Sequence, residues 1–220
     1  MYKMDVSKKI LNANEQYALK NSQILAKHEI VCLNMISSPG SGKTTILTRT
    51  IRELRDKIKI GVIEGDIQTD IDAQKIKAAC AQVVVQINTY GACHLSAAQI
   101  SQVLEKLPLF QLDLIFIENV GNLVCPSAFQ LGEWGKIAVL SVTEGDDKPA
   151  KYPALFAQSK VLLVNKMDLL EATGKVDFDL ERVRTDAQKL NKNMKIFPIS
   201  AKTGKGMSCW YDWLLGLVKR

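Results

Sequence analysis

One stretch decides the fold: Ser37-Ser38-Pro39-Gly40-Ser41-Gly42-Lys43-Thr44, which follows the apolar run 30–36 and precedes a helical pattern at 44–57. A strand, a glycine-containing turn and a helix in this order are typical of a loop that holds phosphates. The glycines let backbone N–H groups approach phosphate oxygens, the start of the helix adds a favourable dipole, Lys43 neutralises phosphate charge, and Thr44 can ligate Mg²⁺. The stretch predicts a P-loop nucleoside triphosphatase whose nucleotide-binding loop residues are Gly40, Ser41, Gly42, Lys43, Thr44 and Thr45.

Apolar runs with strand character alternate with helical patterns along the rest of the chain. The predicted strands are 30–36, 58–63, 83–87, 112–117, 137–142, 160–164 and 195–199. The predicted connecting helices are 44–57, 71–81, 95–107, 178–191 and 208–219, and an amphipathic helix at 7–27 precedes them. Buried strands separated by helices predict an α/β three-layer fold with a mainly parallel central sheet. We expect two parts, an N-terminal helical appendage at 1–28 and a P-loop domain at 29–220.

Composition argues against several classes of protein. The 220 residues are 47% hydrophobic, which is enough for a core of their own. No run approaches the roughly 20 apolar residues of a membrane span, and the polar start lacks the apolar segment of a signal peptide. The five cysteines are too spread out for a disulfide framework, and the lysines behind the net charge of +6 are scattered rather than gathered in a stripe. We expect a soluble cytoplasmic protein with no membrane contact, for which nucleic acid is not the expected partner.

Two acidic segments follow predicted strands. Phosphoryl transfer needs carboxylates that hold magnesium and place the attacking water. Glu64-Gly65-Asp66 follows one strand and Glu118-Asn119-Val120-Gly121 another, where most GTPases begin the second motif with aspartate. Either acid alone could instead cap a helix or lie in an exposed loop. Together with the loop, they predict that Lys43, Asp66 and Glu118 are catalytic and that Thr44, Asp66 and Glu118 hold Mg²⁺.

The base of the nucleotide is indicated by two short motifs near the C-terminus. Asn165-Lys166-Met167-Asp168 follows the strand at 160–164, and Ser200-Ala201-Lys202 follows the strand at 195–199. A carboxylate at Asp168 can accept both the ring N–H and the exocyclic amine of guanine, a pair of donors that adenine lacks. The four-residue pattern is weak by itself, since Asp168 could cap a helix or lie in a turn. The order of the motifs predicts GTP, bound by Asn165, Lys166, Asp168, Ser200, Ala201 and Lys202.

Thiols and an imidazole lie where two strands are expected to end. Cys93 and His94 follow the strand at 83–87, and Cys125 follows the strand at 112–117, seven residues beyond Glu118. Thiolate and imidazole suit Zn²⁺ or Ni²⁺, and three protein donors leave one coordination position open. A buried cysteine is also common as a small hydrophobic residue, so the spacing alone leaves a structural role open. We interpret Cys32, Cys80 and Cys209 as packing residues and His28 as a surface residue.

Several of these motifs together resemble the HypB family of nickel-handling GTPases in hydrogenase maturation. The likeness runs from about residue 33 to 202 and is most specific in Glu118-Asn119-Val120-Gly121-Asn122-Leu123-Val124-Cys125-Pro126. Ala92-Cys93-His94-Leu95 and Glu144-Gly145-Asp146-Asp147-Lys148 also match, and the family's loop resembles S-S-P-G-S-G-K-T, so Ser37 at the first glycine position is a family feature. Tyr90 and Ser96 depart from it, standing where the family usually has glycine and an acid.

The resemblance implies a GTP-dependent homodimer that hydrolyses GTP and delivers nickel to the large subunit of nickel–iron hydrogenase, with the small metallochaperone HypA as partner. It also implies that Cys93, His94 and Cys125 bind nickel or zinc at the dimer interface and that Lys148 reaches nucleotide, in the neighbouring subunit. Two other functions stay open, a urease-type nickel GTPase and a regulatory GTP-binding switch without metal. The adjacent Cys93-His94 and the separate Cys125-Pro126 favour the hydrogenase branch.

Overall fold

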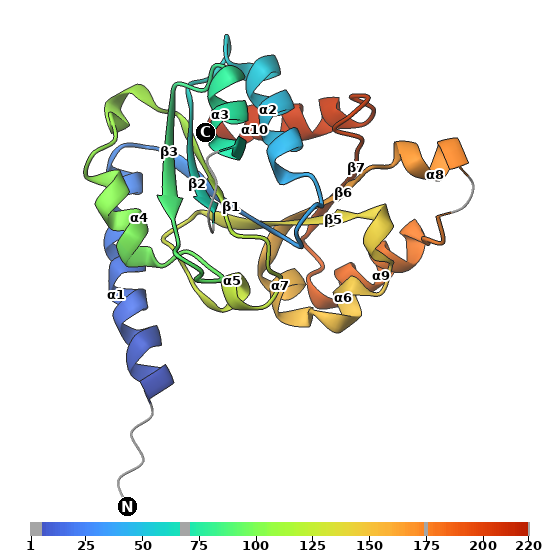
Figure 1. Cartoon of the computed structure of the whole chain (residues 1–220), viewed down its shortest axis with the longest axis horizontal. Coiled ribbons are helices and arrows are strands. Elements are labelled where there is room, and N and C mark those ends of the chain that lie inside the picture. The colour runs from blue at the N-terminus through green and yellow to red at the C-terminus, as the bar shows by residue number, and fades with distance from the viewer. Residues whose placement is uncertain (1–5, 67–70, 174–175, 220) are drawn as a thin grey trace, which may run out of the picture.

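The computed structural model describes residues 6–66, 71–173 and 176–219, with side chains described from residue 12 and not for 171–173 (Figure 1). Seven parallel strands form one sheet in the order β3-β2-β4-β1-β5-β6-β7. The strands are β1 (Val31–Ser37), β2 (Ile60–Asp66), β3 (Val83–Asn88), β4 (Leu114–Glu118), β5 (Gly135–Ser141), β6 (Ser159–Asn165) and β7 (Lys195–Pro198). All seven coincide with predicted strands, and the predicted three-layer P-loop fold is confirmed.

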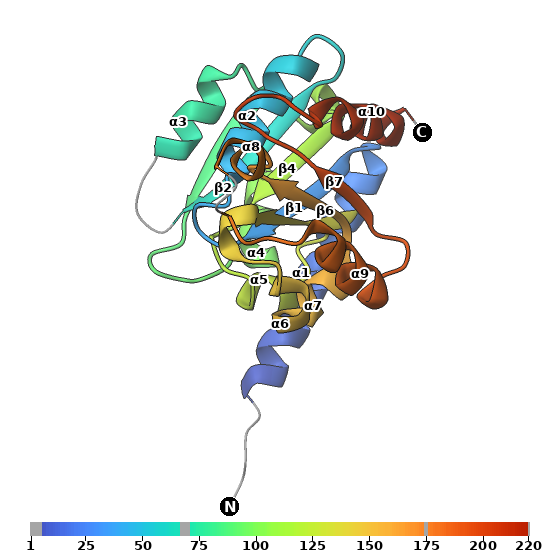
Figure 2. The same ribbon diagram turned by 90° about the vertical axis from the view of Figure 1, so that its right-hand side faces the viewer.

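Helices cover both faces of the sheet. The longer ones are α1 (Val6–Lys27), α2 (Lys43–Leu54), α3 (Ile71–Ala78), α4 (Ala97–Leu104), α9 (Leu180–Leu190) and α10 (Met207–Val218). Short helices are α5 (Cys125–Ala128), α6 (Lys148–Lys151), α7 (Pro153–Gln158) and α8 (Asp168–Thr173), and two single 3₁₀ turns are η1 (Leu109–Gln111) and η2 (Val142–Glu144). The helices α2, α3 and α10 lie on one face, whereas α1, α4, α7 and α9 lie on the other (Figure 2).

The core follows from the alternation of side chains along each strand. In β1, Leu33 and Met35 face the layer of α2 and α10, whereas Cys32 and Ile36 face the opposite layer. Such strands are apolar on both faces, which is the reason they read as continuous hydrophobic runs. The carboxyl ends of all seven strands meet at one edge, and this edge receives the motifs predicted to bind nucleotide and metal.

The N-terminal helix α1 packs against α4, beside which it runs in Figure 1. Its buried Asn21 donates to the carbonyls of Ala97 (2.8 Å) and Leu131 (2.9 Å). The side chain of Asn14 accepts from the Ala97 backbone N–H at 2.8 Å. Buried amides with partners on two other segments fix the position of the helix, while the domain division near residue 28 stays a prediction. Within the described residues, no helix has the length and apolar character needed to cross a membrane.

Differences between expected and observed helices have local causes. The expected helix at 95–107 begins only at Ala97, because Ser96 forms a capping box with Gln99. The short helices α5, α6 and α7, each with proline in its first turn, were not predicted, since one turn shows no periodicity. Two cysteines interpreted as packing residues, Cys80 and Cys209, are exposed, so that interpretation was wrong for them. Cys32 is buried and His28 exposed, as expected.

Candidate functional site

The loop between β1 and α2 has the backbone that a phosphate-binding turn requires. Gly40 (φ 76°) and Gly42 (φ 97°) both lie in the left-handed region, which glycine adopts without strain. Gly42 also has no room for a side chain, because a Cβ there would lie 2.5 Å from Nδ2 of Asn165. The N-terminus of α2 follows at once, so its free N–H groups point into the loop.

Lys43 and Ser37 form the floor of this loop. Ser37 is completely buried at the end of β1, so its side chain fits where the strict pattern has glycine. The Lys43 ammonium donates to Ser37 Oγ at 2.8 Å. Burial lowers the pKa of Lys43, and carboxylates, of which Glu118 has the largest effect, oppose this shift. A buried cation of this kind is poised to exchange its hydroxyl partner for an anionic phosphate.

The predicted magnesium residues meet beside the loop. Thr44 Oγ1 donates to Glu118 Oε1 at 2.8 Å, and both residues line a cavity of about 440 Å³ together with Asp66. Oε2 of Glu118 is buried and has no hydrogen-bond partner among the residues that the structure describes. A hydroxyl and two carboxylates, one of them with an oxygen that has no partner among the described residues, are the donors that Mg²⁺ prefers, so the residues fit the ion.

Two further acids belong to the site, and the sequence analysis assigned neither of them. Glu64 is paired with Glu118 in the register of β2 and β4 and lines the same cavity. Glu144 accepts from the Ser41 hydroxyl at 2.6 Å and from the Ser141 backbone N–H at 3.0 Å, which supports the P-loop from the β5 side. The spacing Ser141-Val142-Thr143-Glu144 is a capping-box signature that could have identified Glu144.

The two motifs predicted to bind the base lie against each other and against the loop. Asn165 Nδ2 donates to the Ser41 carbonyl (2.9 Å), and its Oδ1 accepts from the Ala201 N–H (3.0 Å). The Ser200 hydroxyl donates to Asp168 Oδ1 at 2.6 Å and so orients that carboxylate. These bonds join the three segments into one unit at the carboxyl ends of β1, β6 and β7.

Lys166 and Arg49 connect the two base motifs to the P-loop and to α2. Lys166 (φ 64°) donates to the Gly40 carbonyl at 2.8 Å and therefore belongs to the loop. The Lys202 carbonyl accepts from Arg49 Nη2 (2.9 Å), and Arg49 Nε donates to the Ala201 carbonyl (2.7 Å). Arg49 on α2 is thus a further positioning residue, which no motif in the sequence signals.

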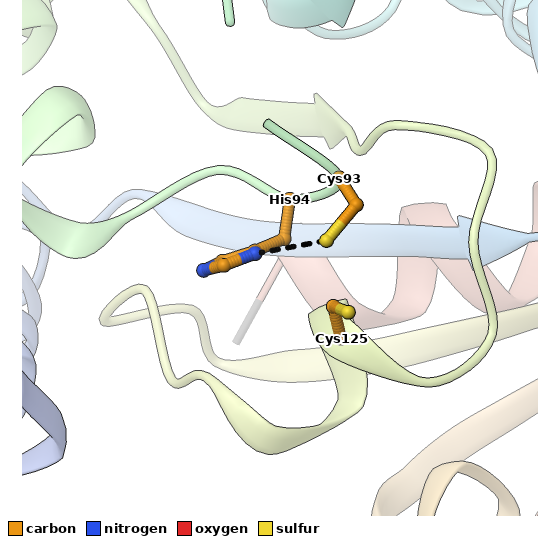
Figure 3. Close-up of side chains that lie close together, drawn as sticks. All are labelled: Cys93, His94 and Cys125. Carbon is orange, nitrogen blue, oxygen red and sulfur yellow. Dashed lines mark hydrogen bonds between the residues drawn. The ribbon is translucent and has the colours of Figure 1, made fainter. Parts of the chain in front are cut away.

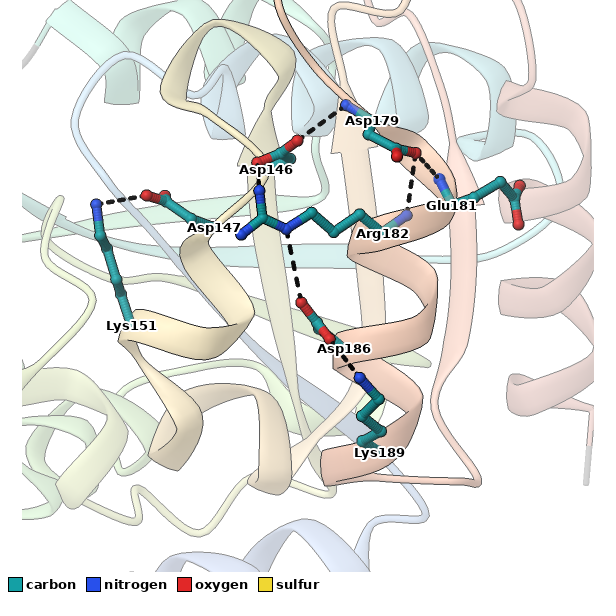
Figure 4. A network of polar contacts seen from close by, with 8 residues as sticks. All are labelled: Asp146, Asp147, Lys151, Asp179, Glu181, Arg182, Asp186 and Lys189. Atoms are coloured by element: carbon teal, nitrogen blue, oxygen red, sulfur yellow. Dashed lines mark hydrogen bonds and ion pairs between the residues drawn. The ribbon is translucent and has the colours of Figure 1, made fainter.

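Lys148 follows a loop that is tied to α9. It is the first residue of α6 and is not among the described residues that line the 440 Å³ cavity. The segment before it is held to α9, where Arg182 Nη1 lies 3.0 Å from Asp146 Oδ1 and the Asp179 N–H donates to Asp146 Oδ2 (Figure 4). Asp147 pairs with Lys151 in the same network. Such exposed pairs contribute little energy individually, but together they fix the loop.

Cys93, His94 and Cys125 converge as predicted (Figure 3). Their ligand atoms lie within 4.8 Å of one another, and Cys93 Sγ is 3.6 Å from His94 Nδ1. The neighbouring Cys125 side chain raises the pKa of the Cys93 thiol through a shared hydrogen bond, and burial lowers the pKa of His94. A neutral imidazole and two thiols that become thiolates on binding fit a borderline or soft divalent metal.

The two halves of this metal cluster are held by packing as well as by polar contacts. The His94 ring stacks on Phe129, with centroids 4.0 Å apart, directly after the helix α5 that begins with Cys125. Below α5, the buried Lys136 ammonium donates to the Ser127 carbonyl (2.7 Å) and to Gln158 Oε1 (2.9 Å). No sequence motif signalled Phe129 or Lys136.

Tyr90 and Ser96, which depart from the family pattern, affect the backbone on either side of the Cys93-His94 pair. Tyr90 is 90% exposed and has φ 49°, the left-handed conformation that glycine would adopt without strain. Ser96 caps α4 and is the start of its capping box. Both residues therefore act on the backbone on either side of Cys93 and His94.

Comparisons with known proteins identify the family of the chain. The family model for the CobW/HypB/UreG nucleotide-binding domain matches residues 32–198. Hydrogenase maturation factor HypB of Escherichia coli strain K12 is 46% identical over 211 residues, which cover 96% of this chain and 71% of that protein. The crystal structure of HypB from Archaeoglobus fulgidus is 38% identical, with a TM-score of 0.86 over 94% of this chain and 100% of that one. HypB from Helicobacter pylori, solved in complex with nickel, is 37% identical, with a TM-score of 0.86 over 94% of this chain and 95% of that one. The chain therefore belongs to the CobW/HypB/UreG family, and within it to the HypB proteins.

Proposed function

We propose that the chain is a GTP-hydrolysing metallochaperone that delivers nickel during the maturation of nickel–iron hydrogenase, and that it acts in the cytoplasm. The observation that carries the proposal is the convergence of Cys93, His94 and Cys125, with ligand atoms within 4.8 Å of one another, beside the segment that begins at Glu118. A nickel-bound HypB structure at 37% identity supports nickel as the cargo.

In the nucleotide site, the chain's own residues would bind the phosphates and the base of GTP and would hold the magnesium ion. Lys43 and the loop N–H groups would hold the β- and γ-phosphates, and Asp168, oriented by Ser200, would accept from guanine. Thr44, Asp66 and Glu118 would hold Mg²⁺, which supplies charge neutralisation for phosphoryl transfer. Asp66 and Glu118 would also orient the attacking water, as catalytic acids of this site.

The metal site would be completed by a second copy of the chain. Three protein donors leave a coordination position open on a four-coordinate ion, and dimerisation on GTP would bring a second set of donors to it. Lys148 is not among the described residues that line the cavity beside the P-loop, and its role across the dimer interface rests on the family resemblance. The family resemblance supplies the partners, a HypA-type metallochaperone and the hydrogenase large subunit.

Nickel dialysis and sedimentation in GDP or a non-hydrolysable GTP analogue test the proposal together. Cys93→Ala/Cys125→Ala should lose the bound nickel, whereas the exposed pair Cys80→Ala/Cys209→Ala is the control for general thiol binding. If the first variant retained nickel, Cys93 and Cys125 would not be the metal site, and the alternative of a metal-free GTP-binding switch would be favoured. If nickel affinity and the sedimenting mass of the protein were identical in the two nucleotides, the proposed coupling between the two sites would be wrong.

Base recognition has its own test. Asp168→Asn replaces an acceptor by a donor at one oxygen, so it should weaken GTP binding and allow xanthosine triphosphate, whose base presents a carbonyl in place of the exocyclic amine. Titration with both nucleotides measures the change. Equal affinity of the variant for GTP would show that Asp168 does not contact the base.

A further inference from the structure

Asn119 lies directly between the nucleotide site and the metal cluster. It follows Glu118 at the end of β4, is 1% exposed and lines the 440 Å³ cavity. Its Oδ1 accepts from two backbone N–H groups, those of Leu95 (3.2 Å) and of Val120 (3.0 Å). One carbonyl oxygen therefore joins the residue after His94 to the segment that begins at Glu118.

Leu95 receives a second restraint from the nucleotide side. Its side chain is fully buried and packs so closely over Gly65 that a Cβ on that glycine would lie 2.8 Å from it. Gly65 immediately precedes Asp66, a proposed magnesium residue. Leu95, the residue after His94, is thus held by both strand ends that supply the acids of the nucleotide site.

The other end of Asn119 is anchored in the core. Its Nδ2 donates to Asn34 Oδ1 (3.2 Å), and Asn34 Nδ2 donates to Glu133 Oε1 (3.2 Å). Glu133 accepts in turn from the Leu131 N–H at 2.6 Å. The bond to Asn34 orients the amide, while the two bonds accepted by Oδ1 are the ones that would pass a movement of the Asn119 backbone to Leu95 and Val120.

We propose that Asn119 is a positioning residue that transmits movement of the Glu118 segment to the Cys93-His94 loop through the Leu95 N–H. The inference rests on the proposed function, because it specifies how nucleotide state reaches the metal. Cys125 is on the same segment as Glu118, so a shift of this segment moves one ligand directly and the other two through Asn119. Without the bond from the Leu95 N–H to Asn119, a shift of the Glu118 segment would move Cys125 but would not move Cys93 and His94 with it.

The test is the ratio of Ni²⁺ dissociation constants measured in GDP and in a non-hydrolysable GTP analogue. A purely structural defect weakens nickel binding in both nucleotides and leaves this ratio unchanged, whereas loss of transmission changes the ratio. Couplings between sites are typically about 5- to 150-fold, and Asn119→Ala should bring the ratio to within about twofold of unity. Reciprocity requires the effect of Ni²⁺ on the ratio of GTP-analogue affinity to GDP affinity to fall by the same factor.

Asn34→Ala is the matched control, since it breaks the same buried chain at the Asn34 end and leaves the Leu95 and Val120 bonds in place. It should keep most of the wild-type ratio, and Asn119→Ser offers a smaller cavity if the alanine variant is unstable. A wild-type ratio in Asn119→Ala, or equal losses in both variants, would overturn the role of Asn119 and leave the proposed function standing. A ratio of one in the wild-type chain would overturn the proposed coupling itself, and this inference with it.

Discussion

Glu64 and Glu118 are paired residues of the neighbouring parallel strands β2 and β4, and both line the cavity beside the P-loop. Each has a buried Oε2 without a hydrogen-bond partner among the described residues. Burial, with the neighbouring carboxylates adding to it, raises the pKa of Glu64 from 4.5 to about 8. Burial likewise raises the pKa of Glu118 to about 7, although Lys43 and Thr44 oppose the shift.

This pair makes the stability of the nucleotide-free protein depend on pH. The folded state holds protons that the unfolded chain releases near pH 4.5, so the free energy of unfolding should fall as pH rises from about 4.5 to about 8. One pKa unit corresponds to about 1.4 kcal/mol, so the loss is on the order of a few kcal/mol. Glu64→Gln should flatten this slope, as measured by urea unfolding in EDTA at pH 5.5 and 8.5.

Magnesium provides the control for the pH experiment. Mg²⁺ with GDP should stabilise the ionised carboxylates and therefore reduce the slope of the wild-type protein as well. An equally steep slope in Glu64→Gln would show that the pH dependence has another origin.

Gly121 should tolerate no side chain. A Cβ at this position would lie 2.9 Å from Pro39 Cγ and 3.0 Å from the Pro39 backbone, so the segment that begins at Glu118 packs directly on the P-loop. Gly121→Ala should push the two apart and weaken GTP-analogue binding by about tenfold or more, the equivalent of at least about 1.4 kcal/mol. Nucleotide titration measures this change.

The matched control for Gly121→Ala is Gly216→Ala. Gly216 lies in α10, where a Cβ would have nothing within 4 Å. Alanine there should stabilise the protein by about 1 kcal/mol, because it has the higher helix propensity, and should leave nucleotide affinity unchanged. Unchanged GTP-analogue affinity in Gly121→Ala would show that the loop can move away from the added methyl group.

Tyr90 should be replaceable by glycine at a gain in stability. Its φ of 49° costs a residue with a Cβ about 1 kcal/mol or more, part of which glycine loses again through the entropy of the unfolded chain. Tyr90→Gly should therefore stabilise the protein by up to about 1 kcal/mol in urea unfolding. Tyr90→Ala, which keeps the Cβ, should not, and a gain shared by both variants would point to the exposed ring instead of the backbone.

The positions of strands could be predicted from the sequence, but the neighbours of each strand could not. Apolar runs located all seven strands, and motifs at their ends located the residues that surround the loop. The contact of the Cys93-His94 loop with Cys125 depends on the order β3-β2-β4, which hydrophobic periodicity does not encode. Glu64 and Asn119 lie inside motifs that the sequence analysis identified. Their roles could not be predicted, because these roles depend on the buried atoms that the fold places next to them.

Lys136 is predicted to fix the short helix that carries the metal ligand Cys125. Its buried ammonium holds the carbonyl of Ser127 in α5, the short helix that begins with Cys125, and also bonds Gln158 in α7. Lys136→Met keeps a long side chain and removes the cost of burying a charge, so global stability should change by no more than about 2 kcal/mol. The helix loses its anchor, however, and nickel affinity should fall about three- to tenfold, since a ligand that must be ordered on binding lowers affinity.

Nickel titration and hydrogen exchange of the α5 amides measure the two effects separately. Lys160→Met makes the same substitution on β6, where the exposed Lys160 lies 4.6 Å from the centroid of the Trp134 ring and not against α5. That control should keep both wild-type nickel affinity and wild-type exchange. Faster exchange of α5 in Lys136→Met with unchanged nickel affinity would mean that the metal orders Cys125 without help from the protein, because the energy of the metal–thiolate bond then exceeds the cost of ordering one helical turn.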